Sequence, residues 1–147
     1  MHLDFVAVRR NGRSKYESPF TEHDGFTDDW WNRPMGDDPK YRFIQVLRDG
    51  AEVGRVELDE KVYTAHYAGA PDLGDVALEI QFIEVVENCR RQGIGAAIIE
   101  YLAETHQRRR LVAFSEGADG FWSSLGWQRY DHPEGPRFHR PLFVRPA

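Results

Sequence analysis

Apolar and polar residues alternate along several segments of the chain, and a period of two predicts β-strands. Alternation predicts strands over 2–8, 41–47, 51–58 and 75–86, and shorter apolar runs predict strands over 111–114, 127–130 and 137–144. Asp49 and Gly50 separate the second and third strands, and this dipeptide is typical of a tight hairpin turn. The sequence therefore predicts a strand-rich protein with a β-hairpin at 41–58.

A helical period is clearest directly after two closely spaced glycines. Apolar residues recur there at the spacing of a buried helical face, at Ile94, Ala97, Ile98, Tyr101 and Leu102. We expect Arg108–Arg110 near the C-terminal end of this helix, where the dipole favours cations. Two further helices are predicted, one over 115–125 that stops at Gly126 and a short one within 21–32 that is capped by Thr27 or Asp28.

Composition narrows the class of protein. With 147 residues, 41% of them hydrophobic, the chain is large enough for one packed α/β domain over 1–147. A net charge of −5 argues against a nucleic-acid partner. The single cysteine, Cys89, excludes an internal disulfide and a cysteine-based zinc site, and we predict no metal. No apolar run reaches the roughly 20 residues of a membrane span, and the first residues lack a signal-peptide layout, so we expect a soluble cytoplasmic protein.

The segment 85–102 combines features of a phosphate-binding turn. Gly93 and Gly95 allow a tight turn and close approach of a ligand, and the helix that follows presents unpaired N–H groups. Arg90 and Arg91 add positive charge. A Walker loop fails because Gly-Lys-Ser/Thr is missing, and the dinucleotide fingerprint fails because Ile98 stands where a third small residue belongs.

The segment 90–96, Arg-Arg-Gln-Gly-Ile-Gly-Ala, resembles the pyrophosphate motif Arg/Gln-x-x-Gly-x-Gly/Ala of the GNAT superfamily of acyl-CoA N-acyltransferases. Val85 stands where that family has the valine that closes its fourth strand. Residues 118–127 are similar to the family's Ala-x-x-aromatic-Tyr-x-x-Leu-Gly-Phe segment. The resemblance is specific over roughly residues 75–130 and only topological before them.

The resemblance implies an α/β fold of the mixed α+β kind. Its sheet has six or seven mostly antiparallel strands, with helices on both faces and with strands four and five splayed to admit acetyl-CoA. It also implies that residues 90–96 hold the pyrophosphate and that the backbone from Phe82 to Val85 holds the pantetheine and the thioester carbonyl. The implied cofactor-binding residues are Phe82, Ile83, Val85, Arg90, Arg91, Gln92, Gly93, Ile94, Gly95, Ala96, Ser115 and Trp122.

Acyl transfer to an amine needs a general base or a water path that takes the ammonium proton. Glu79 is the first candidate, because it lies between Leu78 and Ile80 at the spacing from Arg90 where some family members carry a catalytic glutamate. Glu84 is the second candidate, and His66 is a third that would line the acceptor site. Trp122 occupies the position of the family's usual acid, a tyrosine, which leaves Ser123, Tyr130 or solvent to protonate the thiolate. Glu79 also has a simpler interpretation as a solvent-facing side chain on one side of the sheet.

The predicted function is acetyl transfer from acetyl-CoA directly to a primary amine of a small molecule or protein. Acidic and aromatic residues that suit a cationic amine are Asp24, Asp28, Asp29, Asp37, Asp38, Trp30, Trp31, Tyr63 and Tyr67. The alternative is a catalytically degenerate domain of this family that binds acyl-CoA as a sensor or interaction module, and Trp122 keeps this alternative open. An aminoacyl-tRNA acceptor is opposed by the acidic charge, and a homodimer through the last strands is left undecided.

Overall fold

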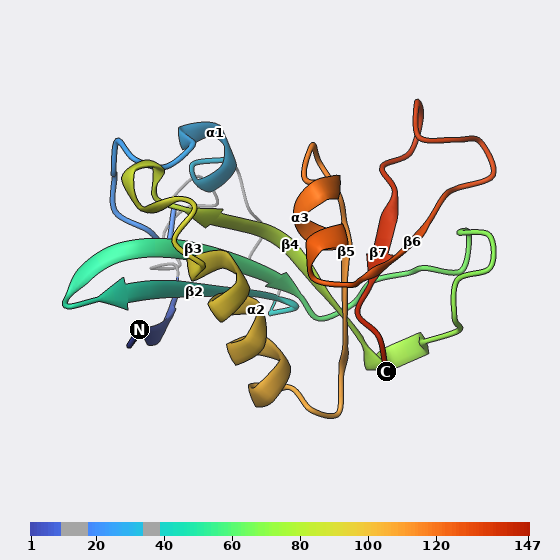
Figure 1. Ribbon diagram of the computed structural model, residues 1–147, viewed down its shortest axis with the longest axis horizontal. Coiled ribbons are helices and arrows are strands. Elements are labelled where there is room, and N and C mark those ends of the chain that lie inside the picture. The colour runs from blue at the N-terminus through green and yellow to red at the C-terminus, as the bar shows by residue number, and fades with distance from the viewer. Residues whose placement is uncertain (10–17, 34–38) are drawn as a thin grey trace. The chain divides into compact units, whose positions relative to one another are not determined.

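The computed structural model describes residues 1–9, 18–33 and 39–147 (Figure 1). Its strands are β1 (Asp4–Val8), β2 (Tyr41–Arg48), β3 (Ala51–Asp59), β4 (Ala77–Val85), β5 (Arg110–Phe114), β6 (Gln128–Tyr130) and β7 (Leu142–Val144). Its helices are α1 (Asp28–Trp31), α2 (Ile94–Thr105) and α3 (Asp119–Ser124). Short 3₁₀ turns cover Gly74–Val76 and Glu87–Cys89.

The strands form a seven-stranded sheet in the order β1-β2-β3-β4-β5-β7-β6. The β4–β5 pair is parallel, whereas β1–β2, β5–β7 and β6–β7 are antiparallel. This mixed, mostly antiparallel sheet with helices confirms the predicted fold class. The β2–β3 hairpin is also confirmed, because Asp49 (φ 52°) and Gly50 (φ 80°) both adopt the positive φ that a type I′ turn requires.

The chain forms two compact units. Unit 1 consists of residues 1–58 and 82–99, and unit 2 consists of residues 59–81 and 100–147. The prediction of a single domain over 1–147 stays a prediction. None of the described helices is both long and apolar enough to cross a membrane.

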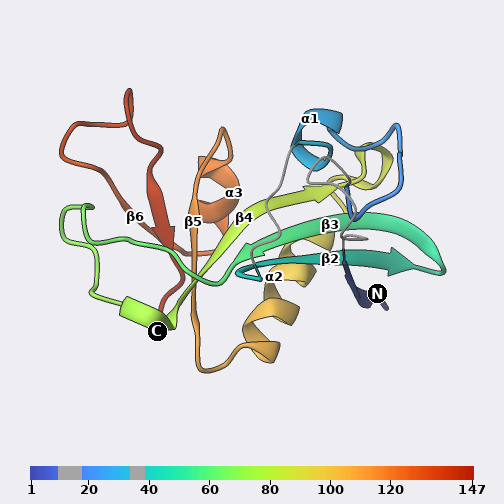
Figure 2. The same cartoon turned by 180° about the vertical axis from the view of Figure 1, so that it is seen from behind.

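Strand β3 is buried on both of its faces in unit 1. On one face, a Cβ built at Gly54 would lie 3.0 Å from the Cδ1 of Ile98 in α2, so glycine leaves room for the Ile98 side chain against the strand. On the other face, the guanidinium of Arg55 lies over the rings of Phe26 (4.2 Å) and Phe20 (4.8 Å). Helices α1 and α2 accordingly lie on opposite sides of β3 in both ribbon views (Figures 1 and 2).

The carboxylate of Glu84 connects three segments of unit 1. It accepts hydrogen bonds from the Thr27 backbone N–H (2.9 Å), the Thr27 hydroxyl (2.6 Å) and the Trp31 indole (2.7 Å). Arg90 approaches the same carboxylate at 3.3 Å from the turn after β4. Glu84 is only 6% exposed, so these donors replace the water that the carboxylate loses on folding.

Unit 2 has its own core where β5, β6 and β7 pair. Val112, Leu142 and Val144 are buried there, and Phe114 and Tyr130 pack against them. Arg109 fixes the start of β5, because its guanidinium pairs with Glu60 and donates to the Ala77 carbonyl at 2.7 Å.

The short helix predicted within 21–32 is confirmed as α1, with Thr27 at its N-cap position, although the Thr27 hydroxyl bonds Glu84 instead of a helix N–H. Several other predicted boundaries were wrong. Helix α3 begins at Asp119 because Ser115 accepts the Ala118 N–H and delays the helix start. Helix α2 ends at Thr105, so Arg108–Arg110 lie beyond it. The last predicted strand is shortened to Leu142–Val144, and the predicted loop residues 10–17 and 34–38, Asp37 and Asp38 included, lie outside the described residues.

Replacing the buried carboxylate of Glu84 should destabilise unit 1. We expect Glu84→Ala to lower the free energy of unfolding by about 3 kcal/mol, because the buried Trp31 indole, the two donors of Thr27 and Arg90 all lose their acceptor. The matched control is Glu87→Ala, at an exposed glutamate three residues later, which should change stability by less than about 0.5 kcal/mol. Urea denaturation measures both, and equal effects would contradict the anchoring role of Glu84.

Candidate functional site

The turn between β4 and α2 has the backbone geometry of an anion cradle. Gly93 has φ +80° and Arg91 has φ +66°, and α2 begins at Ile94 directly after them. The first N–H groups of a helix have no partner within the helix, so they are available to an anion. No atom outside the adjacent residues lies within 4 Å of a Cβ built at Gly93, so its side is open to a ligand.

Side chains of unit 1 hold this turn in place. The Nε of Arg90 donates to the Val85 carbonyl at 3.1 Å while its other end meets Glu84, so this arginine ties the turn to β4. Arg48 donates to the Gln92 side chain at 3.0 Å. The turn is therefore positioned by contacts to strands, and the exposed Arg91 adds charge at the same place. These residues fit a pyrophosphate, which the N–H groups of residues 93–96 would bind.

The other predicted cofactor residues have packing contacts in their own units. The Phe82 ring lies 5.3 Å from that of Trp30 and 4.3 Å from the Arg33 guanidinium, and its neighbour Ile83 is half-buried on the same strand. Trp122 is 3% exposed, with its ring 4.6 Å from that of Trp127. Ser115 is buried and accepts the Ala118 N–H at 3.2 Å. A role beside the cofactor stays a prediction for all of them.

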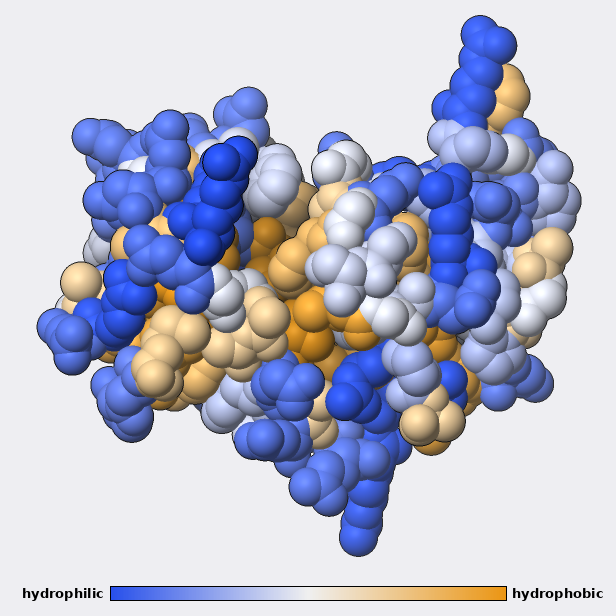
Figure 3. All heavy atoms as spheres, viewed as in Figure 1, coloured by the Kyte–Doolittle hydropathy of each residue, from blue (hydrophilic) through white to orange (hydrophobic). Residues whose placement is uncertain are grey.

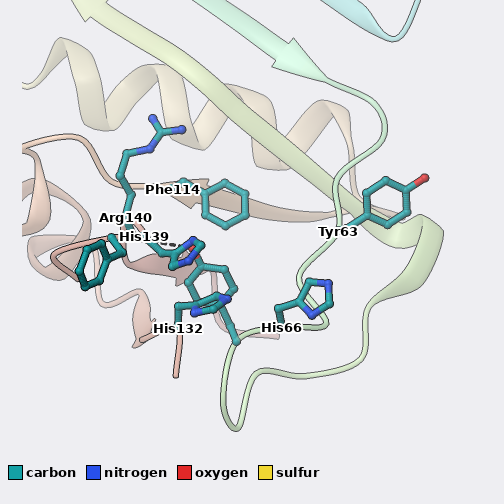
Figure 4. Close-up of a pocket in the computed structure, with 8 residues that line it drawn as sticks. Tyr63, His66, Phe114, His132, His139 and Arg140 are labelled. Carbon is teal, nitrogen blue, oxygen red and sulfur yellow. Dashed lines mark hydrogen bonds between the residues drawn. The ribbon is translucent and has the colours of Figure 1, made fainter. Parts of the chain in front are cut away.

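A cavity of about 460 Å³ opens in unit 2, within the size range of small-molecule sites (Figure 4). Its lining combines aromatic rings with three histidines and one arginine, namely Tyr63, His66, Tyr67, Phe114, His132, Phe138, His139 and Arg140. None of these eight described residues carries a carboxylate. We expected Tyr63, His66 and Tyr67 near the acceptor. The lining residues within 132–140 were not named, because that segment was predicted as a turn and a strand of the last hairpin.

Tyr67 connects the two loops that form this cavity. Its hydroxyl donates to the Arg140 carbonyl at 2.6 Å, and its ring packs 5.4 Å from that of Phe114. Burial raises the pKa of the Tyr67 hydroxyl above 10.0; Arg140 opposes this rise, whereas the negative charges of Asp131 and Glu79 add to it. Tyr67 therefore remains a neutral hydrogen-bond donor at physiological pH.

The strand register places two predicted catalytic residues on one face of unit 2. Glu79 pairs with Val112, and Val112 pairs with Val144, so their side chains share a face. Tyr130 pairs with Leu142 two residues before Val144 in β7, which puts Tyr130 on that face as well. Glu79 is half-buried and lies close enough to Tyr67 to affect the charge balance of its hydroxyl. The best-placed candidate base is thus beside a wall of the cavity.

The other candidates have different surroundings. Both carboxylate oxygens of Glu84 accept hydrogen bonds, which are the contacts of a structural anchor, and its catalytic role stays a prediction. His66 lines the cavity from the loop before β4, as the sequence analysis expected of an acceptor-site residue. Trp31, predicted near the acceptor, is instead buried against Glu84.

The chain matches the sequence model of one protein family. The sequence model of the acetyltransferase (GNAT) family matches residues 5–127. A comparison with curated proteins gives no match.

Solved structures similar to this chain include three acetyltransferase-like folds. An acetyltransferase from Thermus thermophilus aligns with a TM-score of 0.58 at 17% identity, over 76% of this chain and 67% of that one. AtaT complexed with acetyl-methionyl-tRNAfMet aligns with a TM-score of 0.61 at 10% identity, over 99% and 95% of the two chains. The Bacillus subtilis N-acetyltransferase YlbP in complex with coenzyme A aligns with a TM-score of 0.51 at 18% identity, over 71% and 67%. At these identities the likeness establishes the fold alone.

The raised pKa of Tyr67 should be measurable as a pH dependence of stability. The folded state holds the hydroxyl proton more tightly than the unfolded state does. The stabilisation is therefore complete below the unfolded value of about 10 and is lost as pH rises through the folded value. Tyr67→Phe should lose less stability than the wild type between neutral pH and pH values above about 10.

Urea denaturation at a series of pH values makes this comparison. Tyr63→Phe, at a tyrosine that is 82% exposed, controls for the loss of a hydroxyl at the same cavity. Parallel curves for the wild type and Tyr67→Phe would contradict a raised pKa.

Proposed function

This chain belongs to the GNAT acetyltransferase family, and on that basis we propose that it is an acetyl-CoA-dependent N-acetyltransferase that acts directly on a primary amine. The family match carries the proposal, because it spans β4, the Gly93 turn and α3. The open, positive-φ turn at Gly93 supports acyl-CoA as the donor.

In this proposal the backbone of residues 93–96 binds the pyrophosphate of the donor, and the exposed Arg91 adds favourable charge. Arg90 acts indirectly, because its contacts to Val85 and Glu84 fix the turn that presents those N–H groups. The backbone from Phe82 to Val85 takes the pantetheine. When bound, acetyl-CoA supplies the activated thioester.

Glu79 is the proposed general base. A protonated amine cannot attack an acyl group, so the carboxylate of Glu79 takes the ammonium proton. Its place on the same face as Val112, beside Tyr67, supports this role. Tyr67 is a positioning residue, because its bond to the Arg140 carbonyl fixes the cavity wall next to Glu79.

The departing thiolate needs a proton from a source other than Trp122, whose indole is no practical acid. Tyr130 carries a hydroxyl and lies on the same sheet face as Glu79. We assign protonation of the thiolate to this hydroxyl, and solvent is the competing proton source. A thiolate with an ordinary pKa of about 8.5 tolerates a weak donor.

The acceptor is the least constrained part of the proposal. The cavity lining of rings, histidines and Arg140 favours an amine that carries a neighbouring aromatic or negatively charged group. This differs from the cationic amine expected from the acidic segment 24–38. AtaT is described with an acetylated aminoacyl-tRNA, so such a tRNA belongs in any acceptor panel, although the charge of −5 disfavours it here.

The competing proposal is a domain that binds acyl-CoA without transferring the acyl group. Release of free thiol from acetyl-CoA in the presence of an amine panel separates the two, because a sensor releases none. The panel should contain amino acids, aromatic amines, polyamines, peptide N-termini and aminoacyl-tRNA.

Two glycines in unit 1 allow a controlled test of the cofactor site. Gly93 and Gly50 both have φ +80° and open space where a Cβ would lie, so alanine imposes equal backbone strain at each. We expect both variants to lose about 1 kcal/mol of stability. Gly93→Ala alone should weaken coenzyme A binding in calorimetry, by about tenfold or 1.4 kcal/mol. Equal affinities in the two variants would contradict the assigned cradle.

The base is tested by kinetics with whichever amine gives turnover. Glu79→Gln should lower kcat by about 10²–10⁴-fold at neutral pH and leave coenzyme A affinity unchanged, because general base catalysis is lost and the cradle is intact. Rates should recover as pH rises and the free amine becomes abundant. The control is Asp75→Asn, an exposed carboxylate just before β4, which should keep wild-type kinetics. Full activity of Glu79→Gln at every pH would remove Glu79 as the base.

A further inference from the structure

The connection between β6 and β7 gathers three metal-binding side chains. His132, Glu134 and His139 place their ligand atoms within 4.8 Å of one another. We predicted no metal from the single cysteine, whereas these three residues follow the spacing His-x-Glu-x₄-His within one connection. We propose that these three residues form a binding site for a divalent transition metal, with zinc as the best match.

The fold of the connection brings the two histidines together. The Gly135 N–H donates to the His132 carbonyl at 2.8 Å, and the His139 N–H donates to the Gly135 carbonyl at 3.2 Å. Gly135 has φ +88°, and prolines at 133 and 136 restrict the backbone on either side of the turn. Two consecutive turns therefore return His139 to His132, and the imidazole rings stack at 3.6 Å between centroids (Figure 4).

The distance between Glu134 and His139 suits a shared metal. Oε2 of Glu134 lies 3.4 Å from Nε2 of His139, which is long for a hydrogen bond. Two ligands of one tetrahedral zinc, each bound at about 2.0–2.1 Å, lie about 3.3 Å apart. A metal can thus enter between these two atoms with little movement of either side chain. The His132 ring, which stacks at 19° to the His139 ring, must rotate so that its in-plane lone pair reaches the same ion.

The donor set selects the class of metal. Two imidazoles and one carboxylate suit zinc and neighbouring transition metals, whereas calcium and magnesium prefer oxygen ligands. Three protein ligands leave one tetrahedral position for water or another group. His132 and His139 also line the cavity of unit 2, so the metal would stand at the cavity wall. The connection lies at the surface of unit 2, and most of the surface there is hydrophilic, so the site is accessible to aqueous ions (Figures 1 and 3).

Metal binding has a specific consequence for one backbone amide. The Glu134 N–H donates to Nδ1 of His132 at 3.1 Å. A metal on Nδ1 replaces this bond directly, and a metal on Nε2 puts the ring proton on Nδ1, which then no longer accepts. Either mode of binding releases the Glu134 amide.

Calorimetry with zinc chloride on the untagged, chelator-treated full chain tests the proposal. We expect one zinc ion per chain, no displacement by excess magnesium, and a shifted Glu134 resonance in ¹H–¹⁵N spectra. His139→Asn and Glu134→Gln should each weaken zinc binding by at least the roughly 10–100-fold that loss of an outer-shell partner costs. Both side chains are at least partly exposed, and matching circular dichroism will verify folding.

The matched control is His66→Asn, a histidine that lines the same cavity outside the cluster and should leave zinc affinity within twofold of the wild type. The proposal is overturned if the wild type binds no zinc, if both cluster variants bind it as the wild type does, or if His66→Asn weakens binding as much as they do. Zinc binding needs no acetyl-CoA, so the result is independent of the proposed transferase activity.

Discussion

The buried carboxylate of Glu84 is the interaction on which unit 1 depends. Removing a charge from water costs several kcal/mol, and the cost is offset only where charged or polar donors surround the group. Thr27 and Trp31 supply such donors from the segment around α1, and Arg90 supplies another from the turn that precedes α2. One charge thus couples the position of α1 to the position of the predicted cofactor turn. This coupling explains why a helix of only four residues has a defined place, since so short a helix has little stability of its own.

Local sequence signals were sufficient for the β2–β3 hairpin and for helix α2, which pair with backbone groups nearby in the sequence. The alternation in β2 and β3, the Asp49-Gly50 turn and the periodic face of α2 depend on neighbours within a few residues, and the structure confirms them. Family resemblance extended this to a mixed, mostly antiparallel sheet, which cannot be deduced from periodicity alone. The parallel pairing of β4 with β5 is known from the structure. The boundaries that failed, such as the start of α3, depend on single side-chain bonds like that of Ser115, which compete with the helix.

Long-range polar contacts were beyond the sequence analysis. Glu84 was a candidate base in the sequence because nothing there shows which groups bind its carboxylate. Its partners Thr27 and Trp31 are 57 and 53 residues away. Arg55 is buried within an alternating strand whose polar positions a sequence pattern assigns to solvent. The cavity has the same origin: its walls come from 63–67 and 132–140, and pairing of β5 with β7 sets the position of the second of these segments. The periodicity of apolar residues cannot predict such long-range contacts.

Two histidines that line the cavity are also proposed metal ligands, and this links the proposed metal to the proposed acceptor. His132 and His139 belong both to the lining and to the candidate ligand set. If an acceptor contacts either ring, or the open position of the metal, then its binding free energy differs between the metal-loaded and metal-free states. Thermodynamic reciprocity then requires the acceptor to change the metal affinity by the same factor. Asp131 and Glu134 place negative charge beside the histidines. A bound dication would offset this charge and let an anionic group of the acceptor approach the histidines. The lining without carboxylates and the proposed metal would thus both favour an acceptor that carries negative charge beside its amine.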